Sequence, residues 1–303
     1  MKKTSLLNFL LLLLAALIWG SAFVAQSVGM DYVGPFTFLA ARSYLGFGVL
    51  ALFIAIRDRS RGFGFGAKPP AALRRGSLLC GLALFGASLS QQVGIQYTTV
   101  GKAGFLTALY VLFVPFLALL VYRKALPGQI WFCTGLSVAG MYLLCLSGPV
   151  GFSRGDWLTL LCALGFAVQI LLVDRFSPRT DPVKLACGQF LVTALLSTLP
   201  ALMLERPTAA VLAQAWVSIA YAGVLSSGVA FTLQVVAQRD SDPTVCSIIM
   251  CLESVFSALF GALLLGQHLS GREIAGCALM FAAIALSQIP LSSLGRIVRS
   301  VQK

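Results

Sequence analysis

Two charged residues stand inside long apolar stretches of the sequence. Glu253 falls in the middle of a run from about Thr244 to Gly266. Arg42 falls about two helical turns into another run, Pro35 to Ile56. A charge at the centre of a membrane helix costs roughly 2.5–3.5 kcal/mol on insertion scales, so each charge needs a reason. The carboxyl group could bind a proton or an ammonium group, and the arginine could hold a carboxylate through two hydrogen bonds. Alternatively, the carboxyl could tie helices together, and the arginine could pair with helix ends and extend to the membrane surface.

Uncharged polar and aromatic residues in other apolar runs add candidates for a binding site. A glutamine amide offers two donors and an acceptor without the full cost of a charge, although such amides also bond across helix interfaces. The large rings of Trp19 and Phe166 stand beside small residues and could line a cavity. For Tyr110 and Phe231, packing is the favoured alternative to binding. Lys102, at the start of a predicted helix, is a shallower basic candidate. The candidate binding or coupling residues are Glu253, Arg42, Trp19, Gln91, Gln92, Lys102, Tyr110, Phe166, Gln169, Gln189, Phe231 and Gln234.

The chain lacks the groups that hydrolytic or metal chemistry would need. Its single histidine, His268, falls in a predicted outer loop, and no HExxH, GxSxG or phosphate-binding motif occurs. The eight cysteines lie in apolar runs without CxxC spacing, so neither a metal site nor a disulfide framework is predicted. We therefore expect no catalytic residue, no metal and no cofactor, and an intramembrane enzyme is the weaker alternative.

The candidate residues must be positioned by membrane helices. The chain of 303 residues is 58% hydrophobic and 11% charged, far from the balance of a soluble protein. Its apolar runs are about 20 residues long, which is the length that crosses the hydrocarbon core as a helix, whereas a barrel would need short alternating strands. We predict an all-α integral membrane protein with ten transmembrane helices. These helices are predicted at Ser5 to Gln26, Pro35 to Ile56, Gly76 to Gln96, Val100 to Tyr122, Gly128 to Ser147, Asp156 to Phe176, Val183 to Leu204, Ala213 to Ala237, Thr244 to Gly266 and Glu273 to Leu291.

The net charge of +12 does not indicate a nucleic-acid partner, because the basic residues follow the topology of the predicted helices. With the N-terminus in the cytoplasm, cytoplasmic segments hold about four times as many Lys and Arg residues as outer segments, as the positive-inside rule requires. We predict a multi-pass protein of the cytoplasmic (inner) membrane with both termini in the cytoplasm. The first run could pass for a signal peptide, but its removal would leave an odd number of helices and abolish this charge bias.

The two halves of the chain share a register. The stretch Gln91 to Lys124 is echoed by Gln234 to Gln267 at an offset of about 143 residues, with matching hydropathy and sparse identities. We predict two homologous repeats, residues 1–147 and 148–303, with five helices each. Because five is odd, the second repeat is inverted relative to the first, an arrangement found in many secondary transporters.

Four stretches carry a resemblance to a known family. They are AALIWGSAFVAQ (Ala15 to Gln26), FLAARSYLGFGVLAL (Phe38 to Leu52), GIQYTTVGKAGFLTALYVLFVP, and CLESVFSALFGALLLGQHLSGREIAGCALMFAAIALSQ (Cys251 to Gln288). With the ten-helix inverted plan, the chain resembles the EamA-type members of the drug/metabolite transporter (DMT) superfamily. It departs from the family pattern at Ser254, where a proline that kinks the ninth helix is usual, and at Gln267, where a glutamate is usual.

The resemblance implies an inner-membrane carrier, commonly an exporter of amino acids, other metabolites or toxic organic compounds. An arginine for an acid and a carboxylate for an amine suit a zwitterion, so amino acids head the expected small-molecule substrates. We expect alternating access, in which helices 1–4 and 6–9 rock around a central cavity and a proton is the candidate coupling ion. Helices 5 and 10 would pack outside or mediate pairing in a homodimer. A lipid-intermediate flippase and a membrane receptor or scaffold without transport remain as alternatives.

Overall fold

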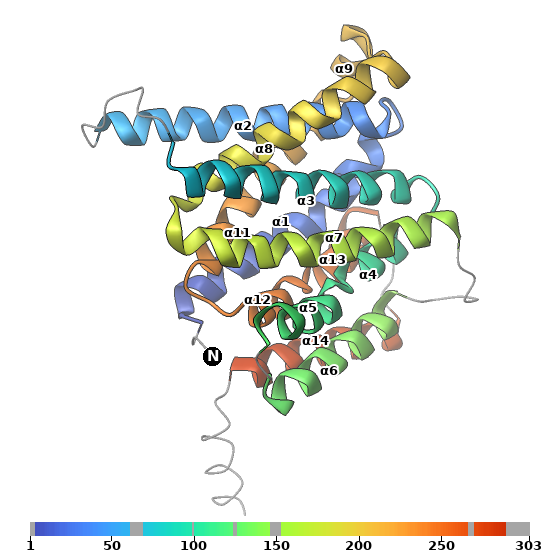
Figure 1. The fold of residues 1–303 in the computed structure, drawn as a ribbon. Helices are drawn as coiled ribbons and strands as arrows, with labels where there is room; N and C mark the ends of the chain where they lie inside the picture. Colours follow the sequence, from blue (N-terminus) through green and yellow to red (C-terminus); the bar gives the residue numbers. More distant parts are fainter. Residues whose placement is uncertain are drawn as a thin grey trace, which may run out of the picture.

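The structure, a computed structural model, is built from helices packed side by side (Figure 1). It describes residues 4–60, 69–98, 100–123, 126–145, 153–265 and 270–288, and every regular element in these ranges is helical. The elements up to residue 145 are α1 (Leu6–Gly29), α2 (Pro35–Ser60), α3 (Ala71–Ile95), α4 (Val100–Ala108), α5 (Tyr110–Tyr122) and α6 (Gly128–Cys145). Those that follow are α7 (Arg154–Phe176), η1 (Ser177–Arg179), α8 (Pro182–Pro200), η2 (Ala201–Glu205), α9 (Ala209–Gln214), α10 (Trp216–Ala220), η3 (Tyr221–Ala230), α11 (Phe231–Gln238), α12 (Pro243–Met250), α13 (Glu253–Leu265) and α14 (Gly271–Gln288).

Eight helical segments within the described ranges are long and apolar enough to cross a membrane. Two further helices of 18 residues each, α6 and α14, pack against one another. They lie along the edge of the bundle opposite α2, with α1, α3 and α7 between the two edges (Figure 1).

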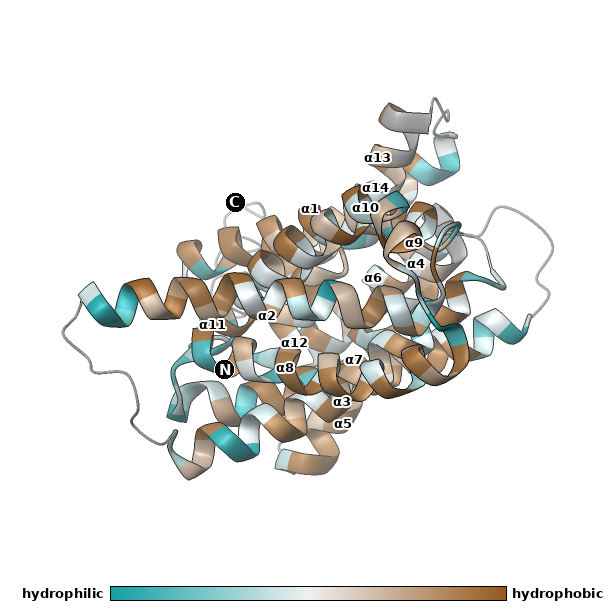
Figure 2. Cartoon of the chain, turned by 90° about the horizontal axis from the view of Figure 1, so that it is seen from above, coloured by the Kyte–Doolittle hydropathy of each residue, from teal (hydrophilic) through white to brown (hydrophobic). Residues whose placement is uncertain are grey.

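The outer surface of the bundle is apolar. Side chains such as Leu52, Leu120 and Leu199 are 63%, 72% and 64% exposed, which would be unfavourable in water but suits contact with lipid. Figure 2 shows hydrophobic residues along the middle of the helices and hydrophilic residues concentrated near their ends. This distribution is that of a multi-pass membrane protein.

Two of the predicted continuous helices are interrupted at equivalent positions. The predicted helix from Val100 to Tyr122 divides at Leu109, and that from Thr244 to Gly266 divides at Cys251 and Leu252. At both places a backbone N–H donates a hydrogen bond to the carbonyl oxygen three residues earlier instead of four. The distances are 3.3 Å at Leu109 and 3.2 Å at Leu252, so the helix is locally tighter. The ninth predicted helix therefore breaks without the proline that Ser254 replaces.

The predicted helix from Ala213 to Ala237 is also not continuous. It consists of α9, α10, the π-helical segment η3 and α11. A methyl group at Gly223 of η3 would lie 2.6 Å from the Cβ atom of Leu45 and 3.0 Å from the carbonyl oxygen of Arg42, so the glycine allows η3 to lie directly against α2. The π-helical turns widen this segment, a feature that recurs at functional sites.

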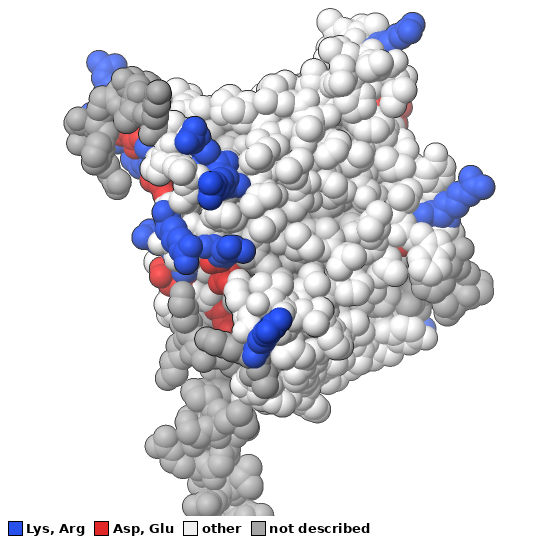
Figure 3. Space-filling model, viewed as in Figure 1, with Lys and Arg blue, Asp and Glu red and all other residues white. Residues whose placement is uncertain are grey.

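Charged residues gather at one end of the molecule, where α2 ends and α8 begins (Figure 3). Arg57 forms ion pairs with Asp181 at 2.7 Å and with Asp58 at 3.0 Å, and Lys184 pairs with Asp58 at 2.7 Å. At the other end of α2, the Glu205 carboxylate accepts hydrogen bonds from the backbone N–H groups of Phe36 at 2.9 Å and Thr37 at 2.7 Å. Polar contacts therefore join α2 to the α8–η2 segment at both ends.

Replacing Asp181 by Ala should lower the stability of the protein by about 1–2 kcal/mol, mainly because Asp181 is the N-cap of α8. Its carboxylate accepts from the N–H groups of Val183 at 2.9 Å and Lys184 at 3.1 Å. The partly exposed ion pair with Arg57 adds little. The thermal unfolding temperature (Tm) in detergent should fall by several degrees. Asp181→Asn, which keeps a side-chain oxygen as the cap acceptor, should recover most of this loss. Equal Tm values for Asp181→Ala and wild type would contradict this role.

Candidate functional site

One pocket draws residues from helices along the whole chain. Its outline takes in about 500 Å³ of space, part of which is open to solvent, and it is lined mainly by aromatic and amide side chains. The lining residues are Trp19, Phe23, Gln26, Arg42, Gln91, Thr107, Tyr110, Phe166, Gln169, Ile170, Ser226, Phe231, Gln234, Met250 and Glu253.

Most of the residues that the sequence suggested for a binding site lie in this pocket. They are Glu253, Arg42, Trp19, Gln91, Tyr110, Phe166, Gln169, Phe231 and Gln234. Two others do not line it, although both are fully buried: Gln92 and Gln189. The side chain of Lys102 lies outside the described part of the structure. Whether the lining residues bind a ligand remains a prediction.

The pocket also contains residues that the sequence analysis did not single out. Phe23 and Gln26 follow Trp19 at helical spacing and share its face of α1, and Thr107 stands three residues before Tyr110. This spacing could have identified these three residues as neighbours of the predicted candidates on the same helix faces. Ser226 enters the pocket through the π-helical segment η3, for which the sequence gives no comparable signal.

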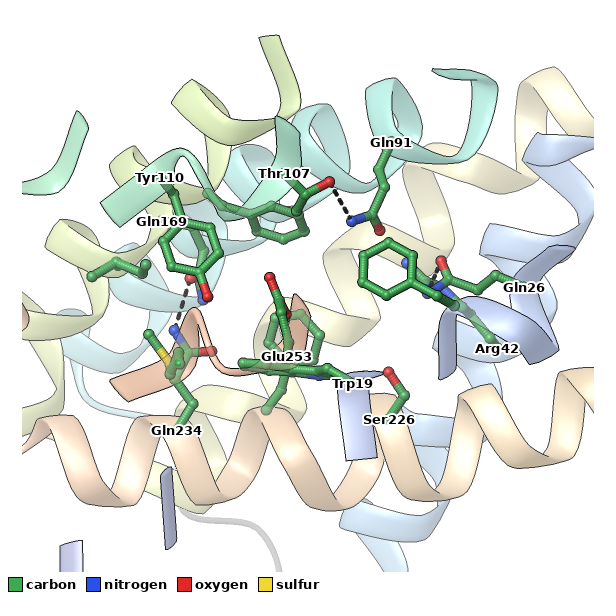
Figure 4. Close-up of a pocket in the computed structure, with 15 residues that line it drawn as sticks. Trp19, Gln26, Arg42, Gln91, Thr107, Tyr110, Gln169, Ser226, Gln234 and Glu253 are labelled. Carbon is green, nitrogen blue, oxygen red and sulfur yellow. Dashed lines mark hydrogen bonds between the residues drawn. The ribbon is translucent and has the colours of Figure 1, made fainter. Parts of the chain in front are cut away.

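Glu253 and Tyr110 occupy equivalent positions beside the two helix breaks. Glu253 is the first residue of α13, and Tyr110 is the first residue of α5. Both side chains are 4% exposed, and the Tyr110 hydroxyl is turned towards the Glu253 carboxyl group (Figure 4). Neither the Tyr110 hydroxyl nor Glu253 Oε1 has a hydrogen-bond partner of ordinary geometry among the described residues. The positive end of the α13 dipole favours a negative charge at Glu253.

Arg42 lies in the same pocket, on the far side of the space from Gln234 (Figure 4). It is 4% exposed, and its Nη1 atom donates to Gln26 Oε1 at 3.1 Å. Its Nε atom has no partner among the described residues. A buried guanidinium that keeps a free donor can hold an anionic group of a ligand.

Aromatic rings line the same pocket as these charges, and Phe190 packs behind them. Phe231 is at their centre, with its ring centroid 4.8 Å from that of Trp19, 5.3 Å from that of Phe190 and 6.4 Å from that of Phe166. Trp19 Nε1 has no partner among the described residues. These rings offer apolar contact area to the body of a ligand.

Hydrogen bonds orient the amides of the pocket. Gln91 Nε2 donates to Thr107 Oγ1 at 3.2 Å, and Gln234 Nε2 donates to Gln169 Oε1 at 3.2 Å. Behind the pocket, Gln169 Nε2 donates to Gln189 Oε1 at 3.2 Å. Gln189 therefore contacts a lining residue rather than the pocket itself. Within the described ranges, no three His, Cys, Asp or Glu residues lie close enough to hold a metal ion.

Close helix packing fixes the position of Glu253. At Gly20, next to Trp19, α1 lies directly against the first turn of α13. A methyl group at Gly20 would lie 2.7 Å from the carbonyl oxygen of Glu253 and 2.6 Å from the Cβ atom of Phe256. Only glycine allows this approach without a shift of backbone.

Gly20→Ala should therefore destabilise the protein by about 1–3 kcal/mol, because the added methyl group forces α1 and α13 apart. The geometry of the pocket should also change, since Glu253 moves with α13. The matched control is Gly48→Ala in α2, where nothing lies within 4 Å of the added methyl group. This control should leave the Tm unchanged or raise it slightly. Equal Tm values for the two variants would contradict the packing argument.

Comparisons with known proteins fit this architecture. The sequence pattern of the EamA-like transporter family matches the chain twice, over residues 6–146 and 153–288. An uncharacterized transporter of Archaeoglobus fulgidus is 29% identical over 279 residues, which cover 91% of this chain and 83% of the relative. A WAT1-related chloroplastic protein of Arabidopsis thaliana is 26% identical over 90% of this chain and 67% of its own length. One crystal structure shares the fold, with a TM-score of 0.76 at 21% identity over 92% of this chain and 96% of that chain.

Proposed function

Because the chain belongs to the EamA-like transporter family, we propose that it is a secondary transporter that exports amino acids or other small metabolites across the cytoplasmic membrane by alternating access. The observation that carries the proposal is a single pocket containing both Arg42 and Glu253. An anionic and a cationic side chain in a pocket lined by aromatic rings match the two charges and the apolar body of an amino acid.

The proposal includes two inverted repeats of five membrane helices, residues 1–147 and 148–303. In this scheme α4 with α5 forms the fourth membrane helix and α12 with α13 the ninth, while α6 and α14 are the fifth and tenth. The equivalent helix breaks support the scheme, since Tyr110 and Glu253 are separated by the same offset as Gln91 and Gln234. Sites at the interface of inverted repeats, built on interrupted helices, are typical of secondary transporters.

The charged end of the molecule supports an orientation with this end, and both termini, in the cytoplasm (Figure 3). A proton carried by Glu253 is the proposed coupling ion. The packing of α6 against α14 at the edge of the bundle leaves this pair available for contact with a second copy in a homodimer.

Uptake and counterflow in proteoliposomes test the proposed function. The assay uses a mixed pool of labelled amino acids, nucleobases and organic cations, with and without a pH gradient. Transport of at least one member is expected, with a rate that responds to the gradient. No transport of any member by well-folded protein would contradict the proposal and favour the lipid-intermediate flippase or a scaffold.

A further inference from the structure

Four glutamines form a hydrogen-bonded chain whose two middle members line the pocket and whose two ends lie behind it. Gln234 Nε2 donates to Gln169 Oε1 at 3.2 Å and to Gln238 Oε1 at 3.0 Å, and Gln169 Nε2 donates to Gln189 Oε1 at 3.2 Å. All four side chains are at most 1% exposed. Gln169 and Gln234 line the pocket, whereas Gln189 and Gln238 lie behind it. We call these four residues the amide chain.

The amide chain couples the orientation of the Gln234 side chain to that of its neighbours. A glutamine nitrogen has two protons, and at Gln234 each proton faces an acceptor oxygen. Rotating this amide alone by half a turn would place Gln234 Oε1 against the oxygens of Gln169 and Gln238, so two hydrogen bonds would become two repulsive contacts unless the neighbouring amides rotated with it. Gln234 Oε1 therefore faces the other way, where it has no partner among the described residues.

The free oxygen of Gln234 shares the pocket with a second free acceptor. Figure 4 shows the Gln234 nitrogen bonded to Gln169 and its oxygen on the side of Glu253. Glu253 Oε1 also has no hydrogen-bond partner of ordinary geometry among the described residues, although the Tyr110 hydroxyl faces this carboxyl group, and both side chains are nine-tenths or more buried. Buried acceptors without a donor are unfavourable unless a ligand or water supplies the donor.

Resting on the transport function proposed above, we propose that Gln234 Oε1 and Glu253 together bind the ammonium group of the substrate, and that Gln238 is the positioning residue that keeps Gln234 Oε1 in place. An ammonium group has three donors and can use both oxygens at once. Trp19 and Phe231, in edge contact in the same pocket, add aromatic surface that favours a cation. Arg42 provides only donors, so it is suited to the opposite, anionic group of the substrate.

The test compares three labelled probes of similar size in equilibrium binding to the purified full-length protein. Phenylethylamine presents only an ammonium group, 3-phenylpropionate only a carboxylate, and phenylalanine both. Gln238→Met removes the acceptor that holds Gln234, so its amide can rotate. We expect this variant to bind phenylethylamine and phenylalanine roughly 10-fold more weakly and 3-phenylpropionate within about 2-fold of wild type.

Gln238→Glu is the matched control, because a carboxyl oxygen can still accept from Gln234 Nε2 whether or not the group is ionised. It should retain most of the ammonium binding. Gln189→Met, at the other end of the amide chain, should shift the same two probes by a smaller factor and gives an independent test if Gln238→Met folds poorly. Size-exclusion profiles and Tm values monitor folding of all variants.

Three results would overturn the inference. The first is unchanged binding of phenylethylamine by Gln238→Met. The second is an equal loss of binding for all three probes in this variant, which would indicate general damage to the pocket. The third is that the wild type binds neither of the two ammonium probes. Proteoliposome uptake is measured separately. Absence of uptake with the expected binding pattern would contradict transport alone, whereas uptake without the pattern would contradict the role of Gln238 alone.

Discussion

Glu253→Gln is expected to reduce the transport of ammonium-bearing substrates by about 10- to 100-fold while leaving the protein folded. The Glu253 side chain is 4% exposed and lines the pocket, and its Oε1 atom has no hydrogen-bond partner of ordinary geometry among the described residues. A glutamine of the same shape loses the negative charge and places an amide that cannot take up a proton where the carboxyl stood. Both substrate binding and coupling to a proton should therefore suffer.

The measurement is initial uptake into proteoliposomes with and without a pH gradient. Glu273→Gln is the matched control, since Glu273 lies in the first turn of α14, outside the pocket lining, and accepts hydrogen bonds from Ser270. This control should transport like the wild type. Normal transport by Glu253→Gln with an unchanged dependence on pH would show that the proposed role of Glu253 is wrong.

The sequence predicted much of the pocket because isolated polar residues in apolar helices are unfavourable unless they face one another. The repeat register was informative as well. Gln91 and Gln234 are equivalent at an offset of about 143 residues, and so are Tyr110 and Glu253. All four lie in the pocket. Residues that correspond in the two halves therefore meet at the centre of the molecule.

The sequence did not reveal which amides face the pocket and which lie behind it. Gln91 and Gln92 are adjacent, and helical geometry turns them about 100° apart, so only one of them can face the same space. Hydropathy does not distinguish them, because both are glutamines, and both are buried in the structure. The helix breaks at Leu109 and at Cys251 to Leu252 were missed for a similar reason, since neither contains a proline or glycine.

Arg42→Met is expected to have the opposite selectivity from Glu253→Gln. Substrates with a carboxylate should bind about 10- to 100-fold more weakly, because a charge-assisted, bidentate contact is lost. Substrates that carry only an ammonium group should be affected far less. The three phenyl probes measure this directly: 3-phenylpropionate and phenylalanine should lose affinity, whereas phenylethylamine should retain it.

Stability provides a second readout for Arg42. Its described hydrogen bond is donated to the uncharged amide of Gln26, and its Nε atom has no partner among the described residues. A buried charge that has no ion-pair partner and an incomplete set of hydrogen bonds lowers the stability of the folded protein. Arg42→Met should therefore unfold at the same temperature as wild type or higher. Arg42→Lys keeps the charge but not the planar fork and should recover only part of the carboxylate binding. A lower Tm together with equal losses for all three probes would instead make Arg42 a structural residue or a gate. A stable variant that loses only carboxylate binding would indicate that the protein retains this charge for its substrate.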